Sequence, residues 1–470
     1  MQDKITRLGY WLAKHQTFIW SIQWVIILIY MLLMFIPVFL PLPDDSATLL
    51  HHFTVFAGFM FWGIWWPFVL ISIVIFGRLW CGVFCPEGAL SEFANRYGRG
   101  KSIPKWLRWK GWCFVAFGMT TLYGQMTSVY QYPKPALLIL GGSTLAAMVV
   151  GFLYGKSSRV WCKYLCPVTG VFSLLARLAP WRYQPQKGEW SKQEYQALKN
   201  ICCPTLLPLS KMTGAANCLM CGKCGIAKNT IELKLRSPHE EIVLYGGEKN
   251  SIYESLLIIF GLCGLALAAF QWSNSFWFSH FQEVVDSWFL AHQITGVFNT
   301  NAPWWIFTHY PERGDVFSWA YGGEVVVYIL SIGLGIGTLL TILIMAATKI
   351  TGSFTLTRFN HLALSLIPLG GMTVFIGLFA NTVNLLQKYA NLGFIWINDL
   401  KLTLLALAAI WSFFLAYKIV KNQTLSTIRR ILGLSVMTLN FFVIYYFWIL
   451  MLTVWSLKSD RISWHVWWAP

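Results

Sequence analysis

Apolar stretches long enough to cross a bilayer recur along this chain and constrain its fold more than any other feature. A helix needs about 20 apolar residues to cross the hydrocarbon core. With 56% hydrophobic and 12% charged residues, the composition is far from that of a soluble globular protein. The sequence therefore predicts an all-α polytopic membrane protein with about nine transmembrane helices. The predicted spans cover approximately residues 18–40, 53–76, 111–127, 136–154, 251–271, 322–347, 361–381, 399–419 and 430–456.

The basic residues flank these stretches unevenly. If successive loops alternate between the two sides, roughly 30 of the 36 Lys and Arg residues lie on the side of the N-terminus. Cytoplasmic loops are enriched in Lys and Arg, so we expect a cytoplasmic N-terminus and a C-terminus on the outer side. The net charge of +17 is thus explained by membrane topology, and no nucleic-acid partner is expected. No small-residue cleavage site follows the first apolar stretch, which we interpret as a retained span.

The spans divide the chain into three predicted regions. Residues 1–154 form an N-terminal membrane region of four helices, which contains the first cysteine motif. Residues 155–250 are the longest polar stretch and are expected to hold a small cytoplasmic module. Residues 251–470 form a C-terminal membrane region of five helices. Within it, residues 272–321 make a tryptophan-rich outer loop, which predicts one or more helices lying at the membrane interface.

A cysteine motif occurs twice in nearly identical form. Arg-x-Trp-Cys-x3-Cys-Pro spans residues 78–86 and again residues 159–167. Two thiols four residues apart on a helical turn lie on one face, so each copy presents a pair of soft ligands. Two copies supply four thiolates, the ligand set of a [4Fe-4S] cluster. Buried unligated cysteines and a zinc site are the alternatives. The predicted ligands of this first cluster are Cys81, Cys85, Cys162 and Cys166.

A second group of cysteines lies in the polar stretch. Cys218, Cys221 and Cys224 form Cys-x2-Cys-x2-Cys, the three-ligand core of a ferredoxin-type motif, whose fourth ligand usually comes from a Cys-Pro elsewhere. Cys203 precedes Pro204 and is the natural candidate, with Cys202 as its rival. A structural zinc site is the alternative. The second group predicts a ferredoxin-like module and a second [4Fe-4S] cluster.

Transfer of electrons across the membrane would require a further redox centre near the outer side. The hydrocarbon core is roughly 30 Å thick, which is too far for clusters at one face to reach alone. The sequence contains no Cys-x-x-Cys-His, so the further centre is expected to be a b-type haem or a quinone. Individually, each outer histidine is more readily explained as an ordinary interfacial residue. The candidates for an outer haem, quinone or metal site are His51, His52, His280, Glu283, His292 and His309.

At the paired cysteine motifs the chain resembles the NosR/NapH/CcoG (RdxA/FixG) group of membrane polyferredoxins. The resemblance covers about residues 55–235. It implies a bacterial inner-membrane protein with four-iron clusters on the cytoplasmic side, and hence a periplasmic C-terminus. It also implies a role in redox supply to respiratory enzymes or in their maturation.

These observations lead to one preferred function and two alternatives. The preferred function is an iron-sulfur electron-transfer protein, an oxidoreductase component embedded in membrane lipid. It would pass electrons from a cytoplasmic donor, a ferredoxin or a reductase, toward a quinone, a haem or a periplasmic redox protein. The first alternative is a metal (copper) reductase or maturation factor for a respiratory metalloenzyme. The second is a regulatory subunit that uses its clusters as redox sensors.

Overall fold

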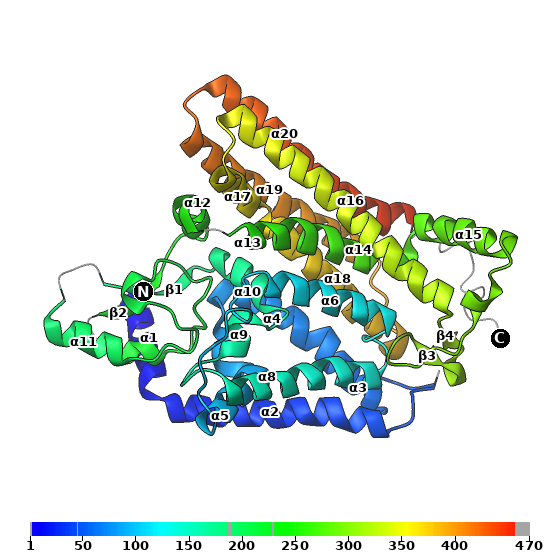
Figure 1. Ribbon diagram of the computed structural model, residues 1–470, viewed down its shortest axis with the longest axis horizontal. Coiled ribbons are helices and arrows are strands. Elements are labelled where there is room, and N and C mark those ends of the chain that lie inside the picture. Colours follow the sequence, from blue (N-terminus) through cyan, green and yellow to red (C-terminus); the bar gives the residue numbers. More distant parts are fainter. Residues whose placement is uncertain (1, 45, 187–189, 228–229, 250, 456–470) are drawn as a thin grey trace.

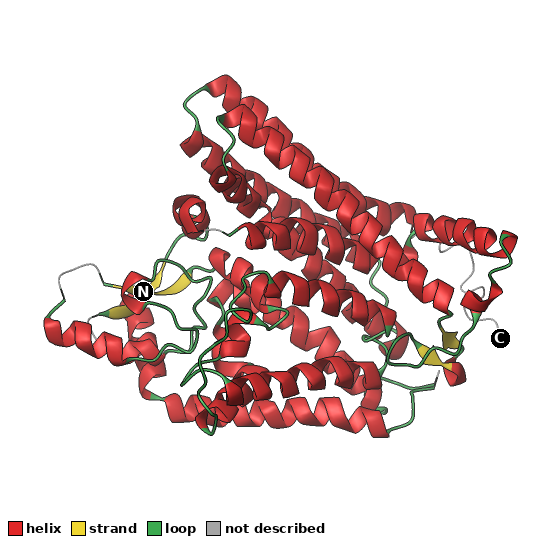
Figure 2. Ribbon diagram, in the orientation of Figure 1, coloured by secondary structure: helices red, strands yellow, loops and turns green. Residues whose placement is uncertain are grey.

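The protein is an elongated bundle of helices with small additional structures at its two ends (Figure 1). The computed structural model describes residues 2–44, 46–186, 190–227, 230–249 and 251–455. Helices dominate, and the few strands form two small sheets at opposite ends of the bundle (Figure 2). The N-terminus lies at one end beside β1 (Trp181–Pro185) and β2 (Ile231–Leu235). Helix α15 (Phe276–Ala291) lies at the other.

Within the described residues, eight helical runs are long and apolar enough to cross a membrane. They confirm an all-α polytopic membrane protein. Several contain more than one helical element because α-helical geometry is interrupted by π-helical or 3-10 turns. The runs are α2 (Gln16–Phe39), α3 with α4 (Phe53–Gly58, Trp66–Phe76), α7 with α8 (Pro133–Ala136, Gly142–Leu153), α13 with α14 (Ile252–Leu256, Leu267–Gln271), α16 (Trp319–Thr351), α17 with α18 (Leu356–Ala363, Ile367–Ala390), α19 (Ile397–Gln423) and α20 (Thr427–Ile449).

The remaining predicted span, over residues 111–127, forms the shorter helix α6 (Trp112–Met126). Its 15 residues give a length of about 22 Å at 1.5 Å per residue, less than the hydrocarbon thickness. Helix α6 nevertheless packs inside the bundle, against α16 and the run that contains α13 and α14. The predicted periplasmic C-terminus concerns residues 456–470, which lie outside the described residues.

The N-terminal end of the molecule carries a small module built on a two-stranded sheet. Strands β1 and β2 are antiparallel, with Trp181 opposite Leu235 and Pro185 opposite Ile231. Helix α1 (Gln2–Lys14) packs on β2. The module also includes α11 (Lys192–Asn200), and α12 (Gly246–Lys249) follows it in the chain.

Helix α1 contacts the module through residues four apart in the sequence. Ile5 and Ala13 are buried, and Gly9 lies so close to β2 that a Cβ atom there would be 2.8 Å from the Leu233 Cβ. Residues at this spacing share one face of a helix. This stripe of small and apolar residues is the sequence signal from which the packing of α1 on the module could have been predicted.

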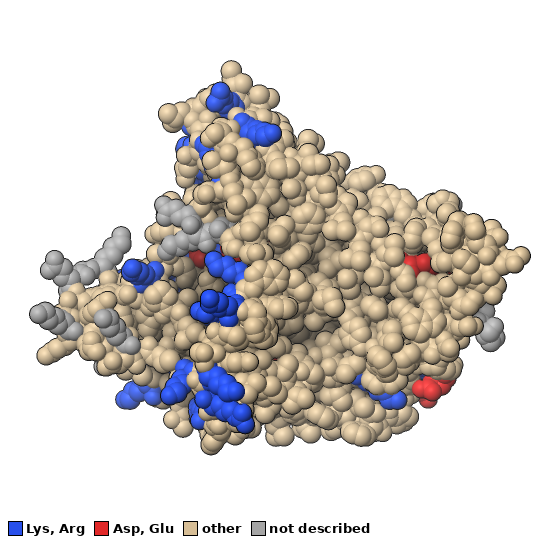
Figure 3. Space-filling model, in the orientation of Figure 1, with Lys and Arg blue, Asp and Glu red and all other residues tan. Residues whose placement is uncertain are grey.

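Charged residues are distributed very unevenly over the surface. On the face seen in Figure 3, Lys and Arg gather mainly in the half of the molecule that contains the N-terminus, while the end that carries α15 shows few. This second end includes β3 (His309–Tyr310) and β4 (Asp315–Val316), which pair as a short antiparallel ladder. The predicted interfacial helix of the tryptophan-rich loop is α15. The charge asymmetry therefore follows the long axis of the bundle.

Candidate iron-sulfur sites

The first cysteine motif lies at the start of a helix that runs into the bundle. Cys81 lies in a π-helical turn, Trp80–Phe84, and Cys85 is the residue before α5 (Pro86–Arg96). Pro86 occupies the first helical position, where its fixed φ fits and its missing N–H leaves no helical hydrogen bond unmade. The second motif is organised similarly. Cys162 lies in α9 (Val160–Tyr164), and Cys166 precedes α10 (Thr169–Leu175).

The two motifs meet at one cavity, although α6 and the run of α7 with α8 lie between them in the sequence. Cys81, Cys85, Cys162 and Cys166 all line this cavity, whose volume is about 230 Å³. It extends beyond the thiols into the apolar interior. Burial raises the pKa of Cys162 to about 12, so that a free thiol there would remain protonated at neutral pH. Bound iron would favour the thiolate.

A buried arginine at the same cavity fits an anionic occupant. Arg78 is 2% exposed, lines the cavity and lies against Cys81. Its guanidinium donates to the Thr169 hydroxyl at 2.8 Å and to the Ala216 carbonyl at 3.3 Å. Among the described residues it has no carboxylate partner. A buried cation without an acid is costly, and a cluster held by four thiolates would supply the missing negative charge.

The second cysteine group surrounds a smaller cavity in the module. Cys203, Cys218, Cys221 and Cys224 line it. The loop between them turns sharply because Met220 and Gly222 adopt left-handed conformations, with φ of 53° and 80°. The Met220 N–H donates to the Cys218 sulfur at 3.4 Å. Such a bond favours the thiolate form.

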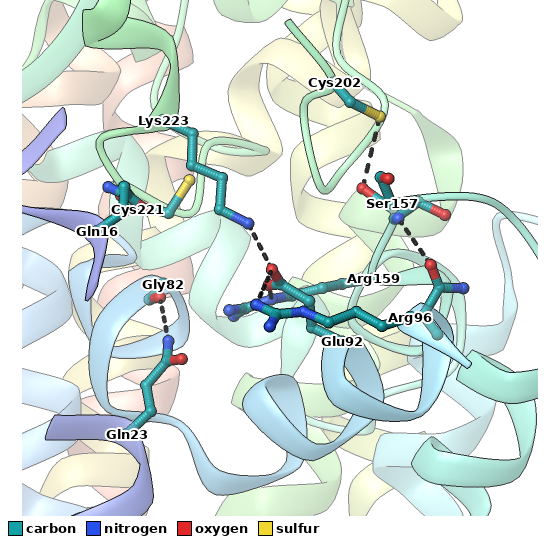
Figure 4. A network of polar contacts seen from close by, with 12 residues as sticks. Gln16, Gln23, Gly82, Glu92, Arg96, Ser157, Arg159, Cys202, Cys221 and Lys223 are labelled. Atoms are coloured by element: carbon teal, nitrogen blue, oxygen red, sulfur yellow. Dashed lines mark hydrogen bonds and ion pairs between the residues drawn. The ribbon is translucent and has the colours of Figure 1, made fainter. Parts of the chain in front are cut away.

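The neighbouring cysteines 202 and 203 point in different directions. Cys203 faces the cavity that the other three thiols line. Cys202 is exposed, and its thiol lies 3.7 Å from the Lys156 carbonyl and 3.5 Å from that of Ser157, as Figure 4 shows for Ser157. The arrangement favours Cys203 over its rival as the fourth ligand.

The spacing of the thiols tests the zinc alternative. Zinc binds thiolate sulfur at about 2.3 Å in a tetrahedron, so its ligands must crowd around one point. In the part of the chain that the structure describes, no three His, Cys, Asp or Glu side chains come close enough to hold a single metal ion. A four-iron cluster is larger and holds its cysteines further apart.

The two cysteine groups are in direct contact through their backbones. A Cβ added to Gly82 would collide with the Leu219 carbonyl oxygen and lie 2.9 Å from the Cys221 nitrogen. Two glutamines of α2 brace this contact. Gln23 donates to the Gly82 carbonyl and Gln16 to the Cys221 carbonyl, each at 3.1 Å (Figure 4).

A partly buried ion network also joins the two groups. Glu92 of α5 accepts from Arg159 Nε at 2.8 Å and from Lys223 Nζ at 2.5 Å (Figure 4). Arg159 also donates to the Cys81 carbonyl at 2.7 Å, while Lys223 lies in the second cysteine loop. Although burial opposes its charged form, the two cations lower the pKa of Glu92 to about 2. Glu92 therefore stays ionised at neutral pH and ties the first motif to the module.

We expect Glu92→Gln to destabilise the docked module by about 3 kcal/mol, because the change leaves Arg159 buried without its counter-ion. The matched control is Arg96→Gln. Arg96 approaches the same carboxylate at 4.0 Å but its side chain is 55% exposed, so the control should cost less than about 0.5 kcal/mol. Protease protection of the module against temperature measures both.

The pH dependence of this loss has a defined sign. The folded pKa of Glu92 lies below the ordinary value of about 4.3, so its stabilisation is complete above that value and is lost as the pH falls toward 2. The difference between wild type and Glu92→Gln should therefore be constant from pH 6 to pH 8. Equal stability of Glu92→Gln and Arg96→Gln would show that Glu92 does not stabilise the docked module.

Several of the predicted outer side chains have local contacts, and their role in a haem or quinone site stays a prediction. His51 accepts from or donates to the Thr48 hydroxyl at 2.8 Å, and His292 meets the Trp288 carbonyl at 2.7 Å. His280 pairs weakly with Glu283 at 3.8 Å, with both side chains exposed. His52 begins α3 and His309 lies in β3, each with a buried Nδ1 that lacks a partner. Among the described residues these side chains do not converge on a metal.

The cysteine cavity offers no histidine to a haem either. Its lining is rich in aromatic side chains and contains no histidine. Part of the lining comes from three helical runs that carry π-helical turns, Phe59–Trp65, Leu137–Gly141 and Leu257–Ala266. Such turns often mark functional positions in helices. No local pattern in the sequence predicts this cavity, because its lining is assembled from distant apolar spans.

Comparison with known proteins matches both copies of the cysteine motif. Residues 59–105 and 137–184 match the family described as a 4Fe-4S binding domain. The first segment contains Cys81 and Cys85, and the second contains Cys162 and Cys166. The second cysteine group lies outside the matched segments. The match supports an iron-sulfur site formed by the duplicated motif.

Two curated bacterial proteins are also similar to the chain. YccM of Escherichia coli (strain K12), which is named as an electron transport protein, is 23% identical over 237 residues, or 44% of this chain and 65% of YccM. Protein NirI of Paracoccus denitrificans (strain Pd 1222) is 26% identical over 189 residues, or 35% of this chain and 27% of NirI.

The similarities are partial in extent. The aligned part spans less than two thirds of either relative. No solved structure matches. The narrower resemblance to the NosR/NapH/CcoG group stays a prediction. Taken with the eight apolar helical runs, the matches support an iron-sulfur, electron-transfer type of multi-pass membrane protein.

Proposed function

We propose that this protein carries two [4Fe-4S] clusters and passes electrons from a cytoplasmic donor, through the module, toward an acceptor within or across the membrane. The observation that carries the proposal is the arrangement of eight cysteines as two adjoining groups of four, each lining its own cavity. Cys81, Cys85, Cys162 and Cys166 would hold one cluster, and Cys203, Cys218, Cys221 and Cys224 the other. When bound, the clusters would supply reversible one-electron storage.

The protein's own residues would set the conditions for that chemistry. Arg78 and Arg159, both buried, would offset the negative charge of the ligated thiolates. Trp80 lines the first cavity and would keep water away from it, which tunes the reduction potential. The contact at Gly82 and the Glu92 network would keep the two groups at a constant separation.

The entry side follows from charge. The end that carries the module is rich in Lys and Arg (Figure 3), which supports a cytoplasmic orientation under the positive-inside rule. A basic surface attracts acidic partners and accelerates their encounter at low ionic strength. We therefore propose a small acidic donor, such as a ferredoxin or an acidic surface of a reductase.

The exit side follows from the shape of the first cavity. Besides the thiols, its lining includes Trp62, Tyr130 and Gln125. An aromatic, mostly apolar lining without histidine suits a quinone better than a haem. A periplasmic redox protein remains the other acceptor. The alternative of a copper reductase or maturation factor loses support, because the outer histidines and Glu283 do not converge in the described residues.

Analysis of the purified full-length protein tests this function. We expect about eight irons and eight sulfides per chain, without haem, and two cluster signals on reduction by electron paramagnetic resonance. Zinc at the second group would exclude a cluster there. Clusters that are reduced but never reoxidised by quinone analogues or by a soluble acceptor would favour the redox-sensor alternative.

A further inference from the structure

A buried carboxylate without a hydrogen-bond donor lies at the end of the bundle opposite the module. Glu324 belongs to the second turn of α16 and is 4% exposed. Both of its carboxylate oxygens are buried and lack a hydrogen-bond partner. Burial of a charged or unpaired carboxylate in an apolar setting is strongly unfavourable. The position therefore requires either protonation or a bound cation.

Two donors near this part of α16 are already engaged. Tyr328, four residues after Glu324, exchanges a hydrogen bond of 2.7 Å with the Ser275 hydroxyl. The Trp272 indole, whose ring lies 6.3 Å from that of Tyr321, donates to Gln125 Oε1 at 2.9 Å. The surrounding side chains belong to an apolar cluster that includes Phe278 and Val325. No tyrosine or tryptophan of this cluster donates a hydrogen bond to the Glu324 carboxylate.

The acidic side chain that meets Glu324 comes from a different helix. Asp286 of α15 faces it at hydrogen-bonding range. Asp286 is half-buried and thus reaches the surface. Among the described residues, neither carboxylate forms an ion pair with Lys, Arg or His. Two ionised carboxylates only repel each other, whereas one proton between them supplies the single hydrogen bond that both lack.

We propose that Asp286 and Glu324 bind one exchangeable proton between them and form a proton site at the α15 end of the molecule. Asp286 connects the pair to water, and Glu324 faces the interior. Trp272, whose ring contacts that of Tyr321, is hydrogen-bonded to Gln125, which lines the cysteine cavity. The titratable groups that interact with Glu324 are Asp286 from α15 and Tyr321 from its own helix.

Infrared difference spectroscopy of the full-length protein in lipid nanodiscs tests the site without requiring electron transfer. We expect a protonated-carboxyl C=O band that persists to neutral pH in wild type and is reduced in Glu324→Gln. Glu283→Gln removes an exposed acid of α15, the helix of Asp286, at 79% side-chain exposure, and should leave the band unchanged. Glu87, buried beside the first cavity, contributes equally to all variants, so the difference spectrum isolates Glu324.

Asp286→Asn separates a shared site from a lone buried acid. Removal of the neighbouring negative charge should lower the midpoint pH of the band by about one unit or more. Because Asp286 is half-buried, Asp286→Asn should fold and can test the shared proton even if Glu324→Gln does not fold. An unchanged midpoint in Asp286→Asn overturns the shared proton. Loss of the band on adding sodium or calcium at constant pH overturns it in favour of a cation site.

Discussion

Replacement of Cys203 by serine is expected to lower the iron content of the purified protein from about eight to about four per chain, whereas replacement of its neighbour Cys202 should leave it unchanged. The two thiols are adjacent in sequence and identical in chemistry, but only Cys203 lines the cavity with Cys218, Cys221 and Cys224. Cys202 is exposed and lies against backbone carbonyls. Iron and sulfide analysis, with the cluster spectra, measures the result.

The same comparison applies to the first group. Cys162→Ser should also remove about half of the iron, while Cys113→Ser, a cysteine that does not line the first cavity, serves as control. Equal losses for Cys202 and Cys203, or retention of eight irons in Cys203→Ser, would refute the assignment. A loss of all iron in either variant would mean that the two groups cannot be loaded separately.

Substitution of Gly82 by alanine is the second change with a large expected effect. The added Cβ would overlap the Leu219 carbonyl oxygen and press on the Cys221 nitrogen at 2.9 Å, and both of these atoms are backbone. Since a backbone cannot rotate away as a flexible side chain can, the module must shift relative to the first motif. We expect a destabilisation of about 1–3 kcal/mol and slower electron transfer between the two groups.

A matched control is available in the same chain. Gly142→Ala adds a Cβ with no atom within 4 Å at the start of α8 and should be neutral or slightly stabilising in a helix. Thermal denaturation compares the variants, and the rate at which a reduced second cluster passes its electron to the first provides a second measurement. If Gly82→Ala has the stability and the transfer rate of Gly142→Ala, the backbone contact does not set the separation.

Much of the architecture could be predicted from sequence because its causes are local. A stretch of about 20 apolar residues must cross the bilayer whatever surrounds it, and eight of the nine predicted spans have helices of sufficient length. The duplicated motif could likewise be recognised from the sequence. Cysteines four residues apart before a proline specify a ligand pair at the start of a helix without reference to the rest of the chain, as Cys85 and Pro86 illustrate.

Features that depend on long-range packing could not be predicted from the sequence. The stacking of α1 on β2 depends on a close approach at Gly9 across more than 200 residues of sequence. The outer histidines shared a side of the membrane in the sequence analysis, but a shared side does not bring side chains within ligand distance, and His51, His280 and His292 each found a local partner instead.

By itself, the sequence determined that this is a multi-pass helical membrane protein with eight cysteines in ligand-spaced groups, because hydrophobicity and spacing act over one helix at a time. The tertiary structure alone decided that Cys81 and Cys162 face one cavity, that Cys203 and not Cys202 faces the other, and that Asp286 meets Glu324. Side-chain direction and the approach of distant helices depend on how the whole bundle packs, and no local pattern encodes that packing.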